Sequence, residues 1–337
     1  MKLLPLTVIC YISLSQFDFF GSKVMAQSSV TYKNTSQASV KQLNSKNSDA
    51  YLKSGISKTD LNDFKGAISD LNQAIDIKPN SAVAFFYRGF SKYKLEDYQA
   101  AIVDFNEAIR LKPDYDKPFY HRGNAYMRLS KLEEATRDYN RTLQISPNFV
   151  EALTHRGLIK TKQGNLRGAM QDFNAVISFA PGFKDAYYHR GNLKDRLGDK
   201  RSAISDYTNA IRIDPNLSEA FHNRGATKLE LVDLNGALSD LNQAIRINPK
   251  EPLAFFTRGK TKAQLGDKNG AINDFTAAIT LKPNFAEAFY NRGLALSQIQ
   301  KKQEAIEDLE RALIFSQQQK NQDISAKATK LLTLLQS

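Results

Sequence analysis

The chain has 337 residues, of which 42% are hydrophobic and 24% are charged, a composition typical of a soluble protein that can bury a core. Its only cysteine is Cys10, which excludes an internal disulfide, and the chain has no apolar stretch long enough to span a bilayer, only a short apolar run at the extreme N-terminus. The net charge of +12 favours anionic partners, but it does not choose among acidic peptides, nucleic acid and an anionic membrane surface.

Residues 1–26 predict an export signal. A charged start at Lys2 is followed by an apolar run over residues 3–14, and Val24 to Ala26 place small residues at both recognition positions of a cleavage site. The run is too short for a stable transmembrane helix. We expect cleavage after Ala26, giving an exported protein, periplasmic or extracellular, without a stable membrane span. The alternatives are an uncleaved signal that tethers the chain to a membrane, and a true start at Met25.

The next segment, residues 27–47, is rich in Ser, Asn, Gln and Lys and nearly free of large apolar side chains. Such a segment cannot bury enough surface to offset the entropy of folding, so we expect a disordered leader.

A period of 34 residues governs the rest of the chain. Arg-Gly pairs recur at this interval, at Arg88, Arg122, Arg156, Arg190, Arg224, Arg258 and Arg292, and prolines keep the same interval from Pro79 to Pro283. Repeats of this length indicate stacked supersecondary units. Eight units follow, over residues 48–81, 82–115, 116–149, 150–183, 184–217, 218–251, 252–285 and 286–319.

Each unit has the pattern of two antiparallel helices that cross closely. Position 8 is always Gly and position 20 always Ala, whereas positions 4 and 24 are large and mostly aromatic. Small residues let two backbones approach, and the large ones fill the flanks. Gly or Asp near positions 15 and 16 predicts the turn, and proline at position 32 ends the second helix.

This pattern closely resembles the tetratricopeptide repeat family over residues 48–319. The resemblance implies an all-α fold, a right-handed superhelix of eight helical hairpins whose first helices line a concave groove. The chain departs from the family pattern at position 4, which lacks Trp, at position 7, usually Arg, and at position 11, often Lys. Residues 320–337 keep helical apolar spacing and predict a capping helix over the end of the stack.

Asp occupies position 23 of all eight units, from Asp70 to Asp308. A half-buried carboxylate needs a partner, so we expect each to pair with the Arg at position 7 of its own repeat, not with that of the next repeat. Three histidines at position 6 (His121, His155 and His189) are also 34 residues apart, too far on neighbouring helices to share a metal. We expect no metal site and no cofactor.

The helical wheel of the first helix leaves positions 2, 5, 9, 12 and 13 facing outward, into the predicted groove. Position 5 is largely aromatic, position 9 includes two asparagines, and position 13 carries four successive cations. Aromatic rings give rigid contact area, asparagines can hold a peptide backbone, and cations attract an anionic chain. The predicted groove residues are Phe86, Tyr120, Asn124, Tyr188, Asn192, Lys94, Arg128, Lys162 and Arg196. The alternative is that position 5 packs on a neighbouring ring and the cations are ordinary surface residues.

The sequence contains no arrangement of a nucleophile with a base, so we expect no enzyme and no small-molecule substrate. The favoured function is a protein-interaction scaffold that binds an extended acidic segment. An architectural spacer without a groove ligand is the main alternative. Nucleic-acid binding is a weaker one, because helical-repeat RNA readers use a longer unit and the charge of this groove is mixed.

Overall fold

The computed structural model describes residue 42 and residues 45–336 of the chain. Within these residues it forms seventeen helices and no strand, which confirms the all-α class. The predicted signal over residues 1–26 and most of the leader over residues 27–47 lie outside the described residues. The helix that opens the first repeat is described over residues 45–60, so it includes three residues ahead of the first unit as the periodicity places it.

Helices alternate along the chain as first and second members of successive hairpins. After the helix over residues 45–60, the first helices are α3 (Ala82–Lys94), α5 (Asp116–Arg128), α7 (Val150–Lys162), α9 (Lys184–Arg196), α11 (Ser218–Glu230), α13 (Pro252–Gln264) and α15 (Ala286–Gln298). The second helices are α2 (Phe64–Ile77), α4 (Tyr98–Leu111), α6 (Leu132–Ile145), α8 (Leu166–Phe179), α10 (Lys200–Ile213), α12 (Leu234–Ile247), α14 (Lys268–Leu281) and α16 (Lys302–Gln318). The capping helix is α17 (Gln322–Gln336).

The turn inside each hairpin requires a left-handed backbone at position 15. Three repeats place glycine there, as at Gly198 with φ +85°, and the other five place a residue with a side chain, as at Val232 with φ +63°. In six of the eight repeats the side chain of the next residue caps the second helix, as where Asp233 accepts a hydrogen bond from the Gly236 amide at 3.0 Å. The turn is therefore a property of the repeat, and glycine is the residue that adopts it without steric cost.

Close crossing of the two helices explains the invariant glycine at position 8. A Cβ built on Gly259 would lie 2.7 Å from the Phe275 ring, and one on Gly191 would lie 2.8 Å from Tyr207. The alanine at position 20 is fully buried in all eight repeats, and the side chain at position 24 is 0–1% exposed in all eight, as in Phe105. These small and large side chains form the core of each hairpin, as the pattern predicts.

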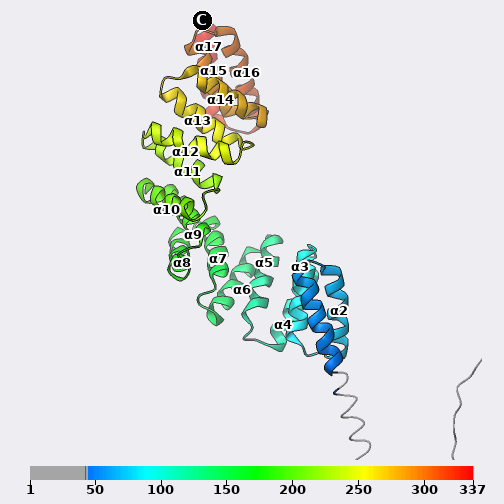
Figure 1. The fold of residues 1–337 in the computed structure, drawn as a ribbon. Helices are drawn as coiled ribbons and strands as arrows, with labels where there is room; N and C mark the ends of the chain where they lie inside the picture. The colour runs from blue at the N-terminus through cyan, green and yellow to red at the C-terminus, as the bar shows by residue number, and fades with distance from the viewer. Residues whose placement is uncertain (1–41, 43–44, 337) are drawn as a thin grey trace, which may run out of the picture. The chain divides into compact units, whose positions relative to one another are not determined.

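The described chain divides into two compact units, one up to Ser130 and one from Lys131 onward. In the first, α2 packs against α3, α3 against α4, and α5 against both α3 and α4. In the second, each second helix packs against the next first helix, and α7, α9, α11, α13 and α15 form a layer of successive neighbours (Figure 1).

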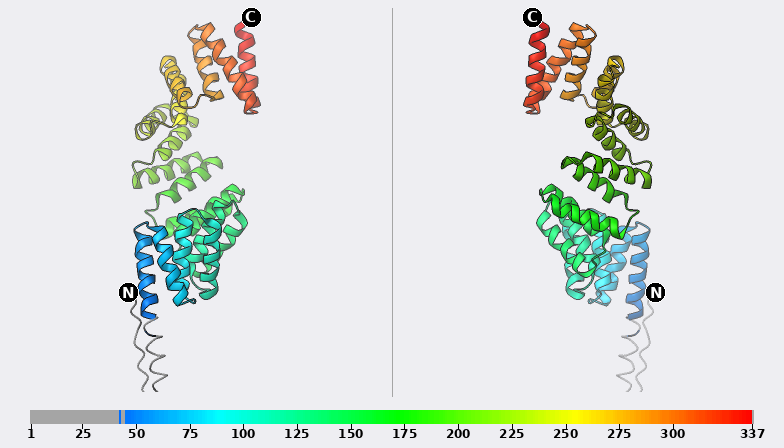
Figure 2. Two further views of the ribbon diagram at one scale, coloured as in Figure 1. Left: turned by 90° about the vertical axis from the view of Figure 1, so that its right-hand side faces the viewer. Right: turned by 90° about the vertical axis from the view of Figure 1, so that its left-hand side faces the viewer.

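The capping helix completes the second unit. It packs against α16 and also against α15, the contacts that a ninth first helix would make, and in Figure 2 it is the red helix at the C-terminal end of the stack. Ile324, Ala328 and Leu332 are buried, and the last two join a core cluster with Phe289 and Leu309. These contacts confirm the predicted cap, which covers apolar surface that the eighth repeat would otherwise expose.

The arginine at position 7 pairs with the aspartate at position 23 of its own repeat, as predicted. In each pair two guanidinium nitrogens donate to the two carboxylate oxygens, with Nη2–Oδ1 distances of 2.6–2.7 Å. Such two-point bonding suits the planar guanidinium group. The pairs are Arg88–Asp104, Arg156–Asp172, Arg190–Asp206, Arg224–Asp240, Arg258–Asp274 and Arg292–Asp308.

The same arginine also connects neighbouring repeats, which the sequence reasoning missed. Its remaining nitrogen donates to the Asn or Thr at position 25 of the preceding repeat: Arg190 donates to Asn174 at 2.7 Å and Arg224 to Thr208 at 2.9 Å. Its guanidinium lies over the ring at position 4, 5.7 Å away for Arg190 over Tyr187. Each arginine therefore stabilises its own hairpin and the contact between hairpins.

Lysine at position 11 is a second counter-ion of the buried aspartate. The Lys194 amine lies 2.8 Å from a carboxylate oxygen of Asp206, and the lysine at position 11 makes the same contact in four other repeats. The first repeat has Ser54 in place of the arginine, and there Lys58 and the Ser54 hydroxyl both donate to Asp70. These two donors hold the pKa of Asp70 below its ordinary value. The lysine thus accounts for the departure from the family pattern at position 11.

Candidate peptide-binding surface

The predicted cations of the first unit are both exposed. The amine of Lys94 lies 5.3 Å from the centre of the Phe90 ring, one turn earlier on α3. The Tyr93 hydroxyl interacts with Arg128 and raises the pKa of its guanidinium, so that side chain stays charged at every physiological pH. Both side chains can reach an anionic ligand.

The predicted aromatic row is only partly available. Phe86 is 4% exposed and packs against Tyr115 and His121, with ring centroids 5.3 and 5.5 Å away. Phe86 is therefore a core residue, which corrects its assignment to the groove. The Phe86 ring is buried at the contact with the next hairpin because two other rings pack against it there. These are Tyr115 at position 34 of the same repeat and His121 at position 6 of the next repeat. Tyr120 and Asn124 are half-buried.

In the second unit, Lys162 and Arg196 are exposed, while Tyr188 and Asn192 are half-buried. The Asn192 amide oxygen accepts hydrogen bonds from the Tyr207 hydroxyl and the Asn223 amide nitrogen, both at 2.8 Å. These bonds fix the orientation of the Asn192 side chain and leave its amide nitrogen as the group that can donate to a ligand. The sequence predicted Asn192 as a groove residue, but it did not predict its hydrogen bonds with Tyr207 and Asn223.

Three hollows lie along the first helices of the second unit, and sequence reasoning missed most of their residues. One of about 230 Å³ is lined by Tyr188, His222 and Asn223 together with the carboxylates of Glu219 and Glu251. A second of about 220 Å³ lies between α13 and α15 and includes Lys260, Gln264 and Asn291. Many of these residues occupy positions 2, 5, 9 and 13, so the hollows lie on the face that the helical wheel predicted.

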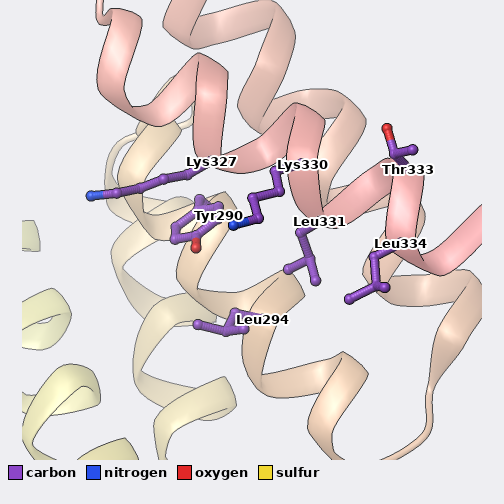
Figure 3. A pocket seen from close by; sticks show the side chains of 7 residues that line it. All are labelled: Tyr290, Leu294, Lys327, Lys330, Leu331, Thr333 and Leu334. Atoms are coloured by element: carbon purple, nitrogen blue, oxygen red, sulfur yellow. The ribbon is translucent and has the colours of Figure 1, made fainter.

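The third hollow, of about 700 Å³, lies between α15 and α17. Figure 3 shows Leu331 and Leu334 pointing from α17 toward α15, which contributes Leu294 and Tyr290. The amines of Lys327 and Lys330 lie on the Tyr290 side of this hollow (Figure 3). It therefore has a cationic end and an apolar end.

The histidines at position 6 lie against aromatic rings. The His189 ring stacks on Phe173 with centroids 5.9 Å apart, and the His155 ring lies 5.7 Å from that of Tyr139. Burial lowers the pKa of both imidazoles. Among the described residues, no group of three or more His, Cys, Asp or Glu side chains is placed to hold a metal ion. None of the described helices combines the length and apolarity needed to cross a membrane.

Family comparison agrees with this geometry. Family models described as "Tetratricopeptide repeat" match residues 48–81, 117–149 and 184–217, and one described as "TPR repeat" matches residues 91–130 and 259–300. The chain belongs to the tetratricopeptide repeat family. Repeats of this family are generally non-catalytic interaction modules. No curated protein matches the chain significantly.

Many solved structures share the fold. A tetratricopeptide repeat protein from Parabacteroides merdae is 20% identical, covers 74% of this chain and 99% of its own, and superposes with a TM-score of 0.54. Pseudomonas aeruginosa pilF is 15% identical over 66% of this chain and 99% of its own, with a TM-score of 0.57. A chain of the APC/C hetero-tetramer Cut9-Hcn1 is 16% identical over 81% of this chain and 53% of its own, with a TM-score of 0.58. At these identities the likeness concerns the fold alone.

Proposed function

We propose that the chain is a non-catalytic protein-interaction scaffold whose first helices bind an extended acidic segment of a partner protein. The family supports an interaction role, and the exposed cations at position 13 support an anionic ligand. Two of these cations belong to each compact unit: Lys94 and Arg128 to the first, and Lys162 and Arg196 to the second. Each unit would bind an acidic segment by itself.

The observation that carries this proposal is the contrast between two classes of basic side chain. The arginines at position 7 and the lysines at position 11 are bound to buried aspartates, as Arg190 and Lys194 are to Asp206. The cations at position 13 are instead exposed, beside half-buried Asn and Tyr side chains. Exposed cations on a preformed surface attract an anionic chain at long range, and the polar and aromatic groups fix it at short range.

The test compares two pairs of substitutions in the full chain. Lys94→Ser with Arg128→Ser alters the first unit, and Lys162→Ser with Arg196→Ser alters the second. The probes are a synthetic peptide of alternating glutamate and glycine and its lysine counterpart, with binding followed by fluorescence anisotropy at low and high salt. Each pair of substitutions should remove binding at its own unit, and the four substitutions together should weaken binding of the glutamate peptide about tenfold and reduce its salt dependence, because screened charge attraction supplies the affinity.

A control pair, Lys302→Ser with Lys282→Ser, removes the same charge elsewhere in the chain. Circular dichroism of all variants should match that of the unaltered protein. If the cation variants bind the glutamate peptide as tightly as the control pair does, position 13 is not the acidic-peptide site. If neither peptide binds the unaltered chain, the spacer alternative is favoured.

A further inference from the structure

The hollow between α15 and α17 brings accessible or half-buried leucines from two helices together around one concave surface. Leu334 is 70% exposed although it lies on the capping helix, and Leu331 and Leu294 are half-buried. The volume of about 700 Å³ is within the range of ligand sites and exceeds what one large side chain requires. A concave surface lined mainly by apolar side chains with a few polar groups is the usual form of a ligand site.

The hollow continues the face that the first helices present. Tyr290 and Leu294 are positions 5 and 9 of the eighth repeat, the positions that also place Tyr188 and Asn192 in the fifth. The capping helix takes the place of a ninth first helix, but with Leu331 and Leu334 facing the hollow. A chain that lies along the first helices could therefore end, or be anchored, at this hollow.

The cationic end of the hollow specifies the charge of the occupant. Lys327 donates to Asp323 at 2.6 Å, one turn earlier on α17. Lys330 makes no ion pair with any residue in the described part of the chain, and its amine lies near Tyr290 (Figure 3). Asp323 therefore balances one of the two lysines, and a ligand carboxylate would complement the other.

Charge also argues against two occupants supplied by this chain itself. The polar segment over residues 27–47 carries Lys33, Lys41 and Lys46 and no acidic residue, so the lysines of the hollow would repel it. A second copy would bring a further net charge of +12 and the same pair of lysines. An acidic segment of a different protein meets both requirements.

We infer that the hollow between α15 and α17 anchors a large apolar side chain, Leu or Phe, that is flanked by carboxylates in an acidic partner segment. This inference rests on the proposed function as a peptide-binding scaffold, but not on the cations at position 13. The apolar anchor lies against Leu294, Leu331 and Leu334, and a flanking carboxylate accepts from Lys330. The hollow would thus select among acidic segments by their apolar residue.

The test uses the full chain and three synthetic peptides: a glutamate-rich peptide with a central Leu-Phe pair, the same peptide with Ser-Ser at the centre, and a lysine-rich peptide with Leu-Phe. Leu334→Asp removes the apolar wall without opening the core, and Lys330→Glu reverses the charge. The matched controls on α16 are Ile314→Asp, at a side chain 52% exposed, and Lys302→Glu.

The acidic Leu-Phe peptide should bind the unaltered chain about tenfold more tightly than its Ser-Ser counterpart, since a buried apolar anchor contributes that much in protein interfaces. Leu334→Asp should abolish this preference, and Lys330→Glu should weaken binding of the acidic Leu-Phe peptide about tenfold. Both controls should leave the affinity for this peptide unchanged. A benzophenone-bearing anchor residue should cross-link to α15 or α17, as mapped by mass spectrometry.

Other outcomes separate this inference from the proposed function. If Leu334→Asp leaves the Leu-Phe preference intact, or if the Leu-Phe and Ser-Ser peptides bind equally, the anchor site is refuted whatever the cations at position 13 do. If the serine variants of the four cations at position 13 bind the glutamate peptide with unchanged affinity while Leu334→Asp abolishes the Leu-Phe preference, the anchor site is supported and the acidic groove is refuted. Absence of any binding by the acidic Leu-Phe peptide overturns the anchor site.

Discussion

Among single residues, the repeat places some side chains in positions that their chemistry does not favour. Val232 adopts φ +63° in the turn of the sixth repeat, although it is β-branched and 71% exposed. At the equivalent position of the seventh repeat, Gly266 has φ +86°, and a Cβ added there would have no atom within 4 Å. The repeat fold thus imposes the left-handed turn whatever residue occupies position 15. Glycine adopts this conformation without strain, whereas a residue with a side chain adds strain.

Val232→Gly should raise the free energy of unfolding by up to about 1 kcal/mol, because relief of left-handed strain exceeds the added entropy of an unfolded glycine. Gly266→Val should lower it by about 1–2 kcal/mol through backbone strain alone, since the new side chain meets no neighbour. Urea titration followed by circular dichroism measures both. A loss of stability in Val232→Gly would show that the valine side chain contributes more than its backbone costs.

The half-buried imidazoles of His155 and His189 give stability a pH dependence with a defined sign. Burial lowers the pKa of His155 and His189 below the ordinary value of 6.5. The unfolded chain therefore binds protons first as pH falls, and stability is lost from about pH 6.5 down to the folded pKa values. Glu151 and Asp185, the nearby carboxylates, oppose this shift without reversing it.

The double variant His155→Asn with His189→Asn removes these groups and uses the residue found at the same position in the sixth and eighth repeats, Asn223 and Asn291. Its melting temperature should vary less between pH 7 and 5 than that of the unaltered chain. Below about pH 4 both proteins should lose stability, because carboxylates such as Asp70, whose pKa is lowered by its donors, become protonated. Parallel pH profiles between 7 and 5 would contradict the histidine assignment.

Among helices and hairpins, the charged cluster around position 7 replaces apolar packing of the family pattern. Arg190 bonds Asp206, reaches Asn174 in the preceding repeat and covers the Tyr187 ring. Asp206 is 2% exposed, so removal of its partners leaves a charge that water cannot solvate. The first repeat shows a milder arrangement, in which a serine hydroxyl and a lysine suffice.

Arg190→Leu should destabilise the chain by about 2–3 kcal/mol, less than for a buried pair that loses its only partner, because Lys194 remains. Arg190→Ser should cost less, since it reproduces the donors of the first repeat. Arg190→Leu combined with Asp206→Leu should recover part of the loss, because no unpaired charge remains. Urea midpoints rank the three variants. If the double variant is less stable than Arg190→Leu alone, the cluster contributes net stabilisation beyond satisfying its own charges.

For the protein as a whole, the prediction of export rests on residues 1–26, which lie outside the described part of the chain. Residues 1–26 have the charged start, apolar run and small-residue site of an export signal, and we propose that the protein is exported. N-terminal sequencing of the protein from its native host should return Gln27 as the first residue. A retained Met1, or a different start, would refute cleavage after Ala26; Ala26→Lys, which blocks the small-residue site, is the control that should retain the signal.

The amino-acid pattern was sufficient to predict the repeat, the helices and the pairing inside each hairpin. Gly at position 8 and Ala at position 20 specify a close crossing whose geometry repeats every 34 residues, and that crossing brings Arg190 to Asp206. These features depend on contacts within one hairpin, where helical periodicity alone fixes which side chains meet.

The accessibility of first-helix residues, in contrast, could be read only from the packing of neighbouring hairpins. Phe86 and Tyr188 share position 5, yet Phe86 is core because Tyr115 and His121 pack over it, whereas Tyr188 lines a hollow. The hollow at Leu331 and Leu334 likewise depends on how the capping helix packs on α15 and α16. Accessibility is set by the size and rotamer of side chains from the next hairpin, which a wheel drawn for one helix does not contain.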